Sequence, residues 1–292
     1  MINVEQLRVK YGDFTALEIN SPIAIEKGDR VGIIGSNGAG KSTFIKAILG
    51  LVKYSGKINS EINVMDMAVH MQENNYAQTM PVKYIIQAVL NTNISKNKML
   101  KDLIEFFDFA PSLNKKFQNL SGGQKQRLTI ILVLMQNAPI TFFDEITSGL
   151  DFETRETLMV KIKEWYKNSD NSLCVVTHYY DELRNLTDKI LILDKGKVVA
   201  YGKTLDLFER YCGKVLFVVD NNETNNLLIR DFRQVTSPKH LLAFSCSSVD
   251  DEIRIATTLS GQNIDYKRIS NDIELLFAGA IKNAEQEGVR DE

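Results

Sequence analysis

The sequence predicts an α/β fold in which a mostly parallel sheet forms a large first unit and a small α+β unit follows it. A glycine-rich loop lies between an apolar strand and an amphipathic helix, and strand-like and helix-like segments alternate from there to about residue 210. A new apolar strand begins after Cys212-Gly213. We therefore expect two domains, residues 1–213 and 214–292, with a helical subdomain at about residues 76–136.

The composition is that of an ordinary globular protein. Of the 292 residues, 44% are hydrophobic and 25% are charged, and the formal net charge of −2 gives no basic surface for nucleic acid. No apolar run reaches the roughly 18 residues of a membrane span, and the N-terminus lacks a signal-peptide pattern. Three widely spaced cysteines favour a reducing compartment. We expect a cytoplasmic protein with no nucleic-acid partner and no direct membrane insertion.

The first elements are predicted to be antiparallel strands. Residues 2–9 and 19–25 alternate apolar and polar positions, and residues 58–64 and 67–71 are two further short strand-like runs. Tyr11 stands at the end of the first run, where its ring is able to stack on a nucleotide base. A half-buried tyrosine at a strand end is the alternative.

The loop Gly35 to Thr43 fits the pattern Gly-x4-Gly-Lys-Ser/Thr, with a strand before it and a helix after it. Glycines let the backbone curl around phosphates, Lys41 offers an ammonium to the terminal phosphates, and Ser42 offers a hydroxyl to Mg²⁺. The alternative is a glycine-rich turn with a surface lysine. We assign these residues to nucleotide binding: Ser36, Asn37, Gly38, Ala39, Gly40, Lys41, Ser42 and Thr43.

A helical insert is predicted after residue 79, because apolar residues recur with a helical period at 82–90 and again at 99–109. These runs hold more apolar side chains than a small insert readily buries, so we expect some to face a partner's helix. The alternative is that the phenylalanines form the insert's own core. A further helix follows the segment Leu120-Ser121-Gly122-Gly123-Gln124.

Polar residues follow two buried strands. Asp144 and Glu145 come directly after residues 140–143, and His178 follows residues 173–176. A carboxylate at a strand tip suits Mg²⁺, so we assign Asp144 to the metal and Glu145 to the attacking water. The His178 imidazole is able to hydrogen-bond the γ-phosphate from this position, and a structural histidine is an equal alternative. For Asp144 and Glu145 the alternative is a solvent-exposed acidic pair.

The remaining elements alternate as expected. Thr141 places a hydroxyl in the strand before Asp144, and we expect it to need a backbone partner. Helices are predicted at 152–166 and near 181, strands at 190–193 and 198–200, and then a strand at 215–219, a polar loop at 221–226, a strand at 241–246, a helix at 249–259, a strand at 266–269 and a helix at 273–284.

The motifs in chain order are Tyr11, Gly35–Thr43, Gln72, Leu120-Ser121-Gly122-Gly123-Gln124, Asp144-Glu145, Ser148-Gly149-Leu150-Asp151 and His178. In this order and spacing they resemble the ATP-binding subunits of ABC transporters over about residues 1–210. The resemblance implies a P-loop NTPase fold of the ABC type, with a mostly parallel core, an antiparallel β lobe and an α-helical subdomain. Residues 148–151 and 269–277 look most like those of ATPases paired with exporters of the ABC-2 type.

The resemblance also implies roles and partners. Tyr11 would stack on adenine, Gln72 would contact the metal or water and couple it to the insert, and His178 would contact the γ-phosphate. The signature segment Ser121, Gly122, Gly123 and Gln124 would meet ATP held by the opposite subunit of a head-to-tail homodimer that closes on two ATP with Mg²⁺. A separate transmembrane permease would dock on the helical insert and hold the protein at the inner face of the cell membrane.

A membrane-free ABC ATPase acting on ribosomes or DNA is the alternative function. Relatives of that kind usually carry a second cassette with a basic linker, or long heptad coils, and neither occurs in this sequence. The role of residues 214–292 stays open between a regulatory or dimer-supporting module and a passive extension.

Overall fold

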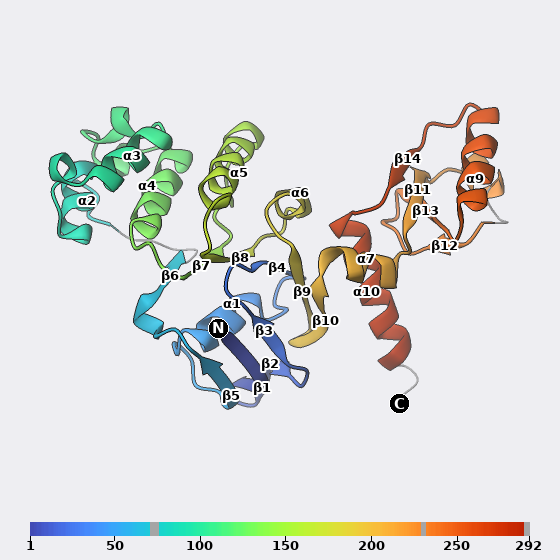
Figure 1. The fold of residues 1–292 in the computed structure, drawn as a ribbon, viewed down its shortest axis with the longest axis horizontal. Helices are drawn as coiled ribbons and strands as arrows, with labels where there is room; N and C mark the ends of the chain where they lie inside the picture. Colours follow the sequence, from blue (N-terminus) through green and yellow to red (C-terminus); the bar gives the residue numbers. More distant parts are fainter. Residues whose placement is uncertain (71–75, 229–231, 289–292) are drawn as a thin grey trace.

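A computed structural model describes residues 1–70, 76–228 and 232–288. It contains a large sheet of 10 strands and a separate sheet of 4 strands near the carboxyl end (Figure 1). The strands of the large sheet are β1 (Ile2–Tyr11), β2 (Phe14–Ile19), β3 (Ile23–Ile25), β4 (Arg30–Gly35), β5 (Ser55–Ser60), β6 (Met67–His70), β7 (Ile140–Asp144), β8 (Ser172–Val176), β9 (Lys189–Asp194) and β10 (Lys197–Lys203).

The large sheet combines a parallel core with an antiparallel lobe, which confirms the predicted fold class. Strands β9, β4, β8, β7 and β6 are neighbours in that order and all pair in parallel. Strand β1 pairs antiparallel with β2, β3 and β5. Because parallel strands all end at one edge, the residues that follow β4, β7 and β8 meet there.

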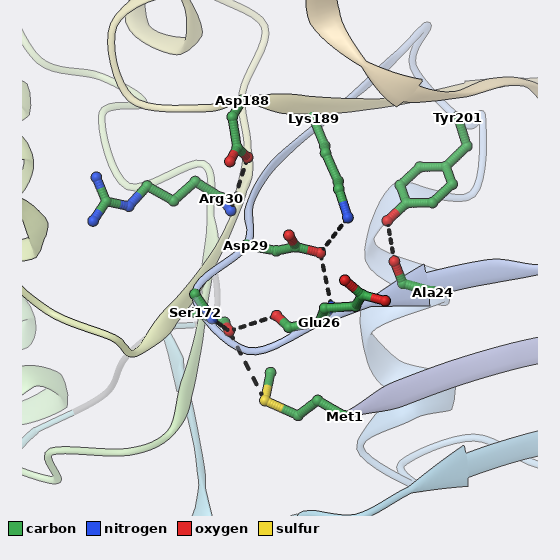
Figure 2. A network of polar contacts seen from close by, with 10 residues as sticks. Met1, Ala24, Glu26, Asp29, Arg30, Ser172, Asp188, Lys189 and Tyr201 are labelled. Carbon is green, nitrogen blue, oxygen red and sulfur yellow. Dashed lines mark hydrogen bonds and ion pairs between the residues drawn. The ribbon is translucent and has the colours of Figure 1, made fainter.

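The opposite edge of the parallel core is fixed by a polar network at the amino ends of β4, β8 and β9 (Figure 2). The Lys189 ammonium lies 2.6 Å from a carboxylate oxygen of Asp29, and that carboxylate accepts a hydrogen bond from the Glu26 amide at 2.7 Å. The Ser172 hydroxyl donates to the Glu26 carbonyl at 3.0 Å. These bonds join the starts of β8 and β9 to the turn before β4, at the edge opposite the carboxyl ends of the strands.

The helices of the large unit cover the parallel core and form the predicted helical subdomain. Those next to the core are α1 (Lys41–Ile48), α5 (Phe152–Tyr166), α6 (Tyr180–Arg184) and α7 (Thr204–Tyr211). The subdomain, green in Figure 1, contains α2 (Val82–Leu90), α3 (Lys98–Phe106) and α4 (Gly122–Leu134), with 3₁₀ turns η2 (Ile94–Lys96), η3 (Ala110–Ser112) and η4 (Phe117–Asn119) between them.

The alternative prediction, that the insert's phenylalanines form its own core, is confirmed for Phe107 and Phe109. Phe107 and Phe109 are fully buried, and Leu103 and Ile104 lie in the same hydrophobic core, so these side chains are the insert's own core. The subdomain is large enough to bury them because α4 supplies apolar residues from Leu128 to Leu134. Exposed apolar side chains on α2 are Tyr84 and Val89, at 51% and 54%.

The carboxyl-terminal sheet has the strand order β12-β13-β11-β14 with antiparallel pairing throughout. Its chain order, β-α-β-β-α-β, is that of a ferredoxin-like unit. The elements are β11 (Val215–Asp220), α8 (Glu223–Leu228), β12 (Gln234–Val235), β13 (Leu241–Cys246), α9 (Val249–Gly261) and β14 (Lys267–Ile269), followed by α10 (Ile273–Gly288).

Strand β11 joins two different cores through its two faces. Phe217 and Val219 belong to a small core with Ile255 and Leu259 of α9. Leu216 and Val218 belong to the core of the large unit. Helix α10 leads back from the small sheet and packs on α7, α6 and β10. The second unit is therefore attached to the large unit by a shared apolar core.

Several local predictions differ from the structure. The segment 221–226 was expected to be a polar loop, but α8 begins at Glu223, and the Asn225 amide donates to the Asn222 side chain at 2.8 Å as a helix cap. The predicted strand at 19–25 is two strands, broken after Ile19. The run at 58–64 ends as a strand at Ser60 and is followed by a 3₁₀ turn, η1 (Val64–Asp66). No helix in the described residues is long and apolar enough to cross a membrane.

Candidate active site

The glycine loop connects β4 to α1 and curls around the Lys41 side chain. Gly40 precedes α1 with a φ of 98°, and a Cβ there would lie 3.0 Å from the Ala16 carbonyl oxygen, so only glycine fits. Lys41 is 6% exposed, and its ammonium donates to the carbonyls of Gly35 and Ser36 at 2.8 and 3.1 Å. Burial lowers the Lys41 pKa, and the carboxylates of Asp144 and Glu145 oppose that shift. The loop thus holds the Lys41 ammonium against two of its own backbone carbonyls.

Asp144 ends β7 beside Ser42, the second residue of α1. The Asp144 side chain is buried, and burial raises its pKa while a hydrogen bond with the Ser42 side chain lowers it. Carboxylate and hydroxyl oxygens are hard donors of the kind Mg²⁺ prefers. Among the described residues no group of three or more His, Cys, Asp and Glu forms a complete metal site. The pair fits a magnesium ion whose remaining ligands come from nucleotide phosphates and water.

Glu145 and His178 meet at the carboxyl edge of the sheet. His178 Nε2 lies 2.8 Å from Glu145 Oε1, and their side chains are 40% and 20% exposed. The Glu145 backbone has a φ of 52°, unusual for a residue other than glycine, and its amide donates to the Val176 carbonyl at 3.0 Å. The two strands thus bring together a carboxylate and an imidazole from residues 33 positions apart (178 − 145 = 33). This contact favours a functional histidine over a buried structural one.

A network that the motifs did not indicate supports the His178 segment. The Thr177 hydroxyl donates to the buried Glu182 carboxylate at 2.6 Å, and the Tyr179 amide donates to Thr177 Oγ1 at 3.0 Å. Arg155 of α5 lies 3.6 Å from Glu182 and stacks over the Tyr179 ring at 3.9 Å. Burial raises the Glu182 pKa, and the hydrogen bond from Thr177 opposes this. The only sequence signal was a carboxylate close after His178.

The signature segment starts α4, in the helical subdomain. The Gln124 amide donates to Ser121 Oγ at 3.3 Å, and the Ser121 amide donates to Gln124 Oε1 at 3.1 Å, which is a complete capping box. A Cβ at Gly123 would lie 2.7 Å from Thr154 Cγ2 of α5, so this glycine also permits close helix packing. Gly122 is the first residue of the helix. Ser121 and Gln124 therefore have a structural role besides the predicted binding role.

The other predicted site residues have mixed outcomes. Tyr11 ends β1 and is 51% exposed, which leaves its ring accessible for stacking. Gln72 lies outside the described residues. The expectation of a backbone partner for Thr141 is wrong, because the buried Tyr166 hydroxyl donates to Thr141 Oγ1 at 2.8 Å. Burial raises the pKa of Tyr166 to about 12.

Comparison with known sequences identifies a family. The profile described as ABC transporter matches residues 20–148. The energy-coupling factor transporter ATP-binding protein EcfA1 of Mycoplasmopsis pulmonis is 31% identical over 227 residues, covering 71% of this chain and 84% of the relative. The methionine import ATP-binding protein MetN of Clostridium tetani is 30% identical over 244 residues, 76% of each chain. The tungstate uptake system ATP-binding protein TupC of Peptoclostridium acidaminophilum is 30% identical over 207 residues, covering 68% of this chain and 96% of the relative.

Solved structures share the fold. A structure described as the ATP-binding subunit of an ABC transporter has a TM-score of 0.64 at 23% identity and covers 73% of this chain and 94% of its own. A dimeric bacterial ABC transporter cassette has a TM-score of 0.61 at 24% identity, and the match covers 70% of this chain and 98% of that structure's chain. Together with the sequence relatives and the site geometry, these similarities show that this chain belongs to the ABC transporter family as an ATP-binding subunit with ATPase activity.

Proposed function

We propose that two copies of this chain close head to tail on two ATP molecules and that hydrolysis drives a separate transmembrane permease. The observation that carries the proposal is the division of the phosphate-binding groups between two parts of the chain. Lys41, Asp144, Glu145 and His178 lie at the carboxyl edge of the parallel sheet, whereas the start of α4 belongs to the helical subdomain (Figure 1). A second copy is able to present its Ser121 segment to this edge.

Each residue at the edge has a proposed task. Lys41 binds the terminal phosphates, and the exposed Tyr11 ring stacks on adenine. Glu145 orients the attacking water and accepts its proton, and His178 holds both Glu145 and the γ-phosphate in place. Ser42 and Asp144, with Gln72 as a further ligand, would hold Mg²⁺, which when bound neutralises charge on the phosphates. The amides at the start of α4 add donors and the positive end of a helix dipole.

Mixed dimers test the shared site. A chain carrying Ser121→Arg keeps its own Lys41 edge but blocks its signature segment, and a chain carrying Lys41→Ala has the opposite defect. A mixture of the two should recover part of the wild-type ATPase rate, because each heterodimer rebuilds one complete site. Each single variant alone is the control. If mixing restores no activity although heterodimers are detected by two affinity tags, then each chain hydrolyses ATP without its partner and the proposal fails.

The permease is proposed to dock on the exposed face of α2. Tyr84 and Val89 are the exposed apolar side chains there, and a membrane protein's helix would cover them. We expect Tyr84→Glu and Val89→Glu to abolish co-purification with the permease and leave the ATPase rate of the isolated chain unchanged. Val160→Glu on α5 is a matched control, because Val160 is 53% exposed and outside the subdomain. Co-purification of ribosomes or DNA in place of a membrane protein would instead support the membrane-free alternative.

The direction of transport needs its own measurement. MetN and TupC are named for import and uptake, so the resemblance to exporters of the ABC-2 type finds no support in these relatives. ATP-dependent accumulation of substrate in vesicles with the ATPase on the outside indicates export from the cell. ATP-dependent loss of substrate from the same vesicles indicates import.

A further inference from the structure

Helix α6 directly follows His178 and contacts the carboxyl-terminal unit on its other side. Arg184 Nη2 lies 2.9 Å from Asp272 Oδ2, just before α10. The Tyr180 and Phe277 rings have centroids 5.8 Å apart with 34° between their planes. The other Asp272 oxygen accepts the Leu275 amide at 3.0 Å, so Asp272 both starts α10 and binds α6.

Helix α6 depends on these neighbours for its position. It has 5 residues, and a helix that short is unstable without tertiary contacts. On one side Glu182 ties it to Thr177 and Arg155. On the other side three contacts hold it to α10 and the residue before it. They are the Arg184–Asp272 ion pair, the Tyr180–Phe277 ring contact, and the hydrophobic core that includes Leu183 and Leu276. Any displacement of α10 therefore acts on a segment that begins two residues after His178.

A cavity of about 320 Å³ lies at this junction and is lined by His178 as well as by residues at the start of α10. His178 is thus next to open space on the side of the carboxyl-terminal unit and next to Glu145 on the other. The open space gives the segment room to move, since packed side chains do not fill it. The contacts at Arg184 and Tyr180 are what restrain it on this side.

We propose that α10 is a positioning element for the ATP site, in which Asp272 and Phe277 hold α6 so that His178 meets Glu145. The carboxyl-terminal unit then sets the rate of hydrolysis without touching ATP. This rests on the proposed role of His178 at the γ-phosphate. The positioning residues are Arg184, Asp272, Tyr180 and Phe277; His178 is the group that they position.

Charge reversal in the full-length chain tests the proposal. Arg184→Glu replaces attraction to Asp272 with repulsion, and Phe277→Leu removes the ring contact. We expect each to lower kcat by roughly 5-fold or more, at the lower end of coupling between distant sites, with KM for ATP unchanged. Arg184→Lys keeps the ion pair and should restore most of the rate. The melting temperature should hardly change, because Arg184 is 44% exposed and exposed ion pairs contribute little stability.

The control is Arg268→Glu, which reverses a similar ion pair inside the carboxyl-terminal unit. Arg268 lies 2.8 Å from Glu252, and the two side chains are 52% and 24% exposed, close to the 44% and 19% of Arg184 and Asp272. This pair joins β14 to α9, whose buried residues lie in the small core, so its reversal should leave kcat unchanged. A wild-type kcat for Arg184→Glu, or an equal loss for Arg268→Glu, overturns the proposal.

A double-mutant cycle separates positioning from general damage. In a His178→Ala background the positioned group is gone, so adding Arg184→Glu should cost nothing further in single-turnover hydrolysis. Additive losses would show that α10 acts by another route and would overturn the inference. If His178→Ala alone keeps the wild-type rate, the proposed role of His178 in hydrolysis is wrong. That result differs from additive losses, which would overturn only the proposal that α10 positions His178.

Discussion

The two sheets of this protein differ in strand direction and in where their polar and apolar side chains lie. In the large sheet, parallel strands end together, and polar side chains collect at that edge: Lys41 and Asp144 are buried, and Glu145 is partly buried. In the small sheet all pairing is antiparallel, and strand ends alternate between its two edges. The polar chemistry of the chain therefore concentrates in one sheet, whereas the second sheet contributes two apolar faces.

The two faces of β11 pack into different apolar cores. One face packs under α9 in a core of its own, and the other packs into the core that holds the ATP-binding half. A strand buried on both faces links two cores without supplying a reactive group. We infer that changes at the large sheet's edge alter function at constant stability, whereas changes in the small unit alter stability or the position of its neighbours. The following predictions test this division.

The largest expected effect compares two buried leucines of the carboxyl-terminal region. Leu276 of α10 lies in the shared core and Leu259 of α9 lies in the small core, and both are fully buried. Replacing either with alanine leaves a cavity and should cost about 2–5 kcal/mol. Leu276→Ala should shift the unfolding of the whole chain. Leu259→Ala should unfold the small unit first.

Trp165 makes this distinction measurable. It is the single tryptophan and lies on α5, packed against the large core, so its fluorescence follows the large unit alone. Urea unfolding followed by Trp165 fluorescence and by far-ultraviolet circular dichroism should coincide for Leu276→Ala and separate for Leu259→Ala. Coincident curves for Leu259→Ala would show that the two cores unfold as one cooperative unit.

The next effect concerns turnover at the edge of the large sheet. Glu145→Gln keeps the shape of the side chain but removes the base, so kcat should fall by ~10²-fold while ATP still binds. The urea midpoint should stay within error of wild type. Steady-state hydrolysis and equilibrium binding of labelled ATP measure the two properties separately. Near-normal turnover together with tight binding would remove Glu145 from the mechanism.

Lys41→Ala should instead weaken binding. The ammonium faces the phosphates in the ground state as well as in the transition state, and a charged hydrogen bond contributes about 1.5–3 kcal/mol. The dissociation constant for ATP should therefore rise by roughly 10- to 100-fold. Lys46→Ala, on the same helix but outside the loop, is the control in the same binding assay. Equal losses in both variants would point to a general charge effect and not to a phosphate contact.

The sequence predicted which polar residues meet at one edge of the large sheet, because they stand at strand ends and the strands are visible as apolar runs. Asp144, Glu145 and His178 follow such runs directly, so a parallel sheet places them together. The Arg184–Asp272 pair was not predictable, since its members are 88 positions apart and belong to no motif. The same holds for Arg155 and Glu182, whose contact depends on how α5 lies against α6.

Sequence-based predictions of secondary structure and burial were wrong where contacts between distant segments determine them. The asparagine-rich segment 221–226 has low helix propensity, but the Asn222 cap begins α8 within it. The insert was expected to leave some apolar side chains for a partner, but α4 buries most of those on α3 and after it. Helix α7 was not predicted at all, although Leu207 and Phe208 are buried in the shared core. Each of these depends on a contact between segments distant in sequence.

The smallest effect concerns the buried hydroxyl pair of Thr141 and Tyr166, which supports β7 from behind without touching the site. Tyr166→Phe removes one buried hydrogen bond and should cost about 1 kcal/mol of unfolding free energy with kcat unchanged.

The buried Tyr166 hydroxyl also predicts a pH dependence of stability. The Tyr166 pKa is raised to about 12 in the folded chain, so between its unfolded value of roughly 10 and about 12 the unfolded chain loses the proton first. Stability from this group is complete below the lower value and falls as pH rises through the upper one. Urea midpoints measured across that range should fall less steeply in Tyr166→Phe than in wild type, whereas Tyr84→Phe, at an exposed position, should keep the wild-type slope. Equal slopes in all three proteins would show that Tyr166 does not titrate with the fold.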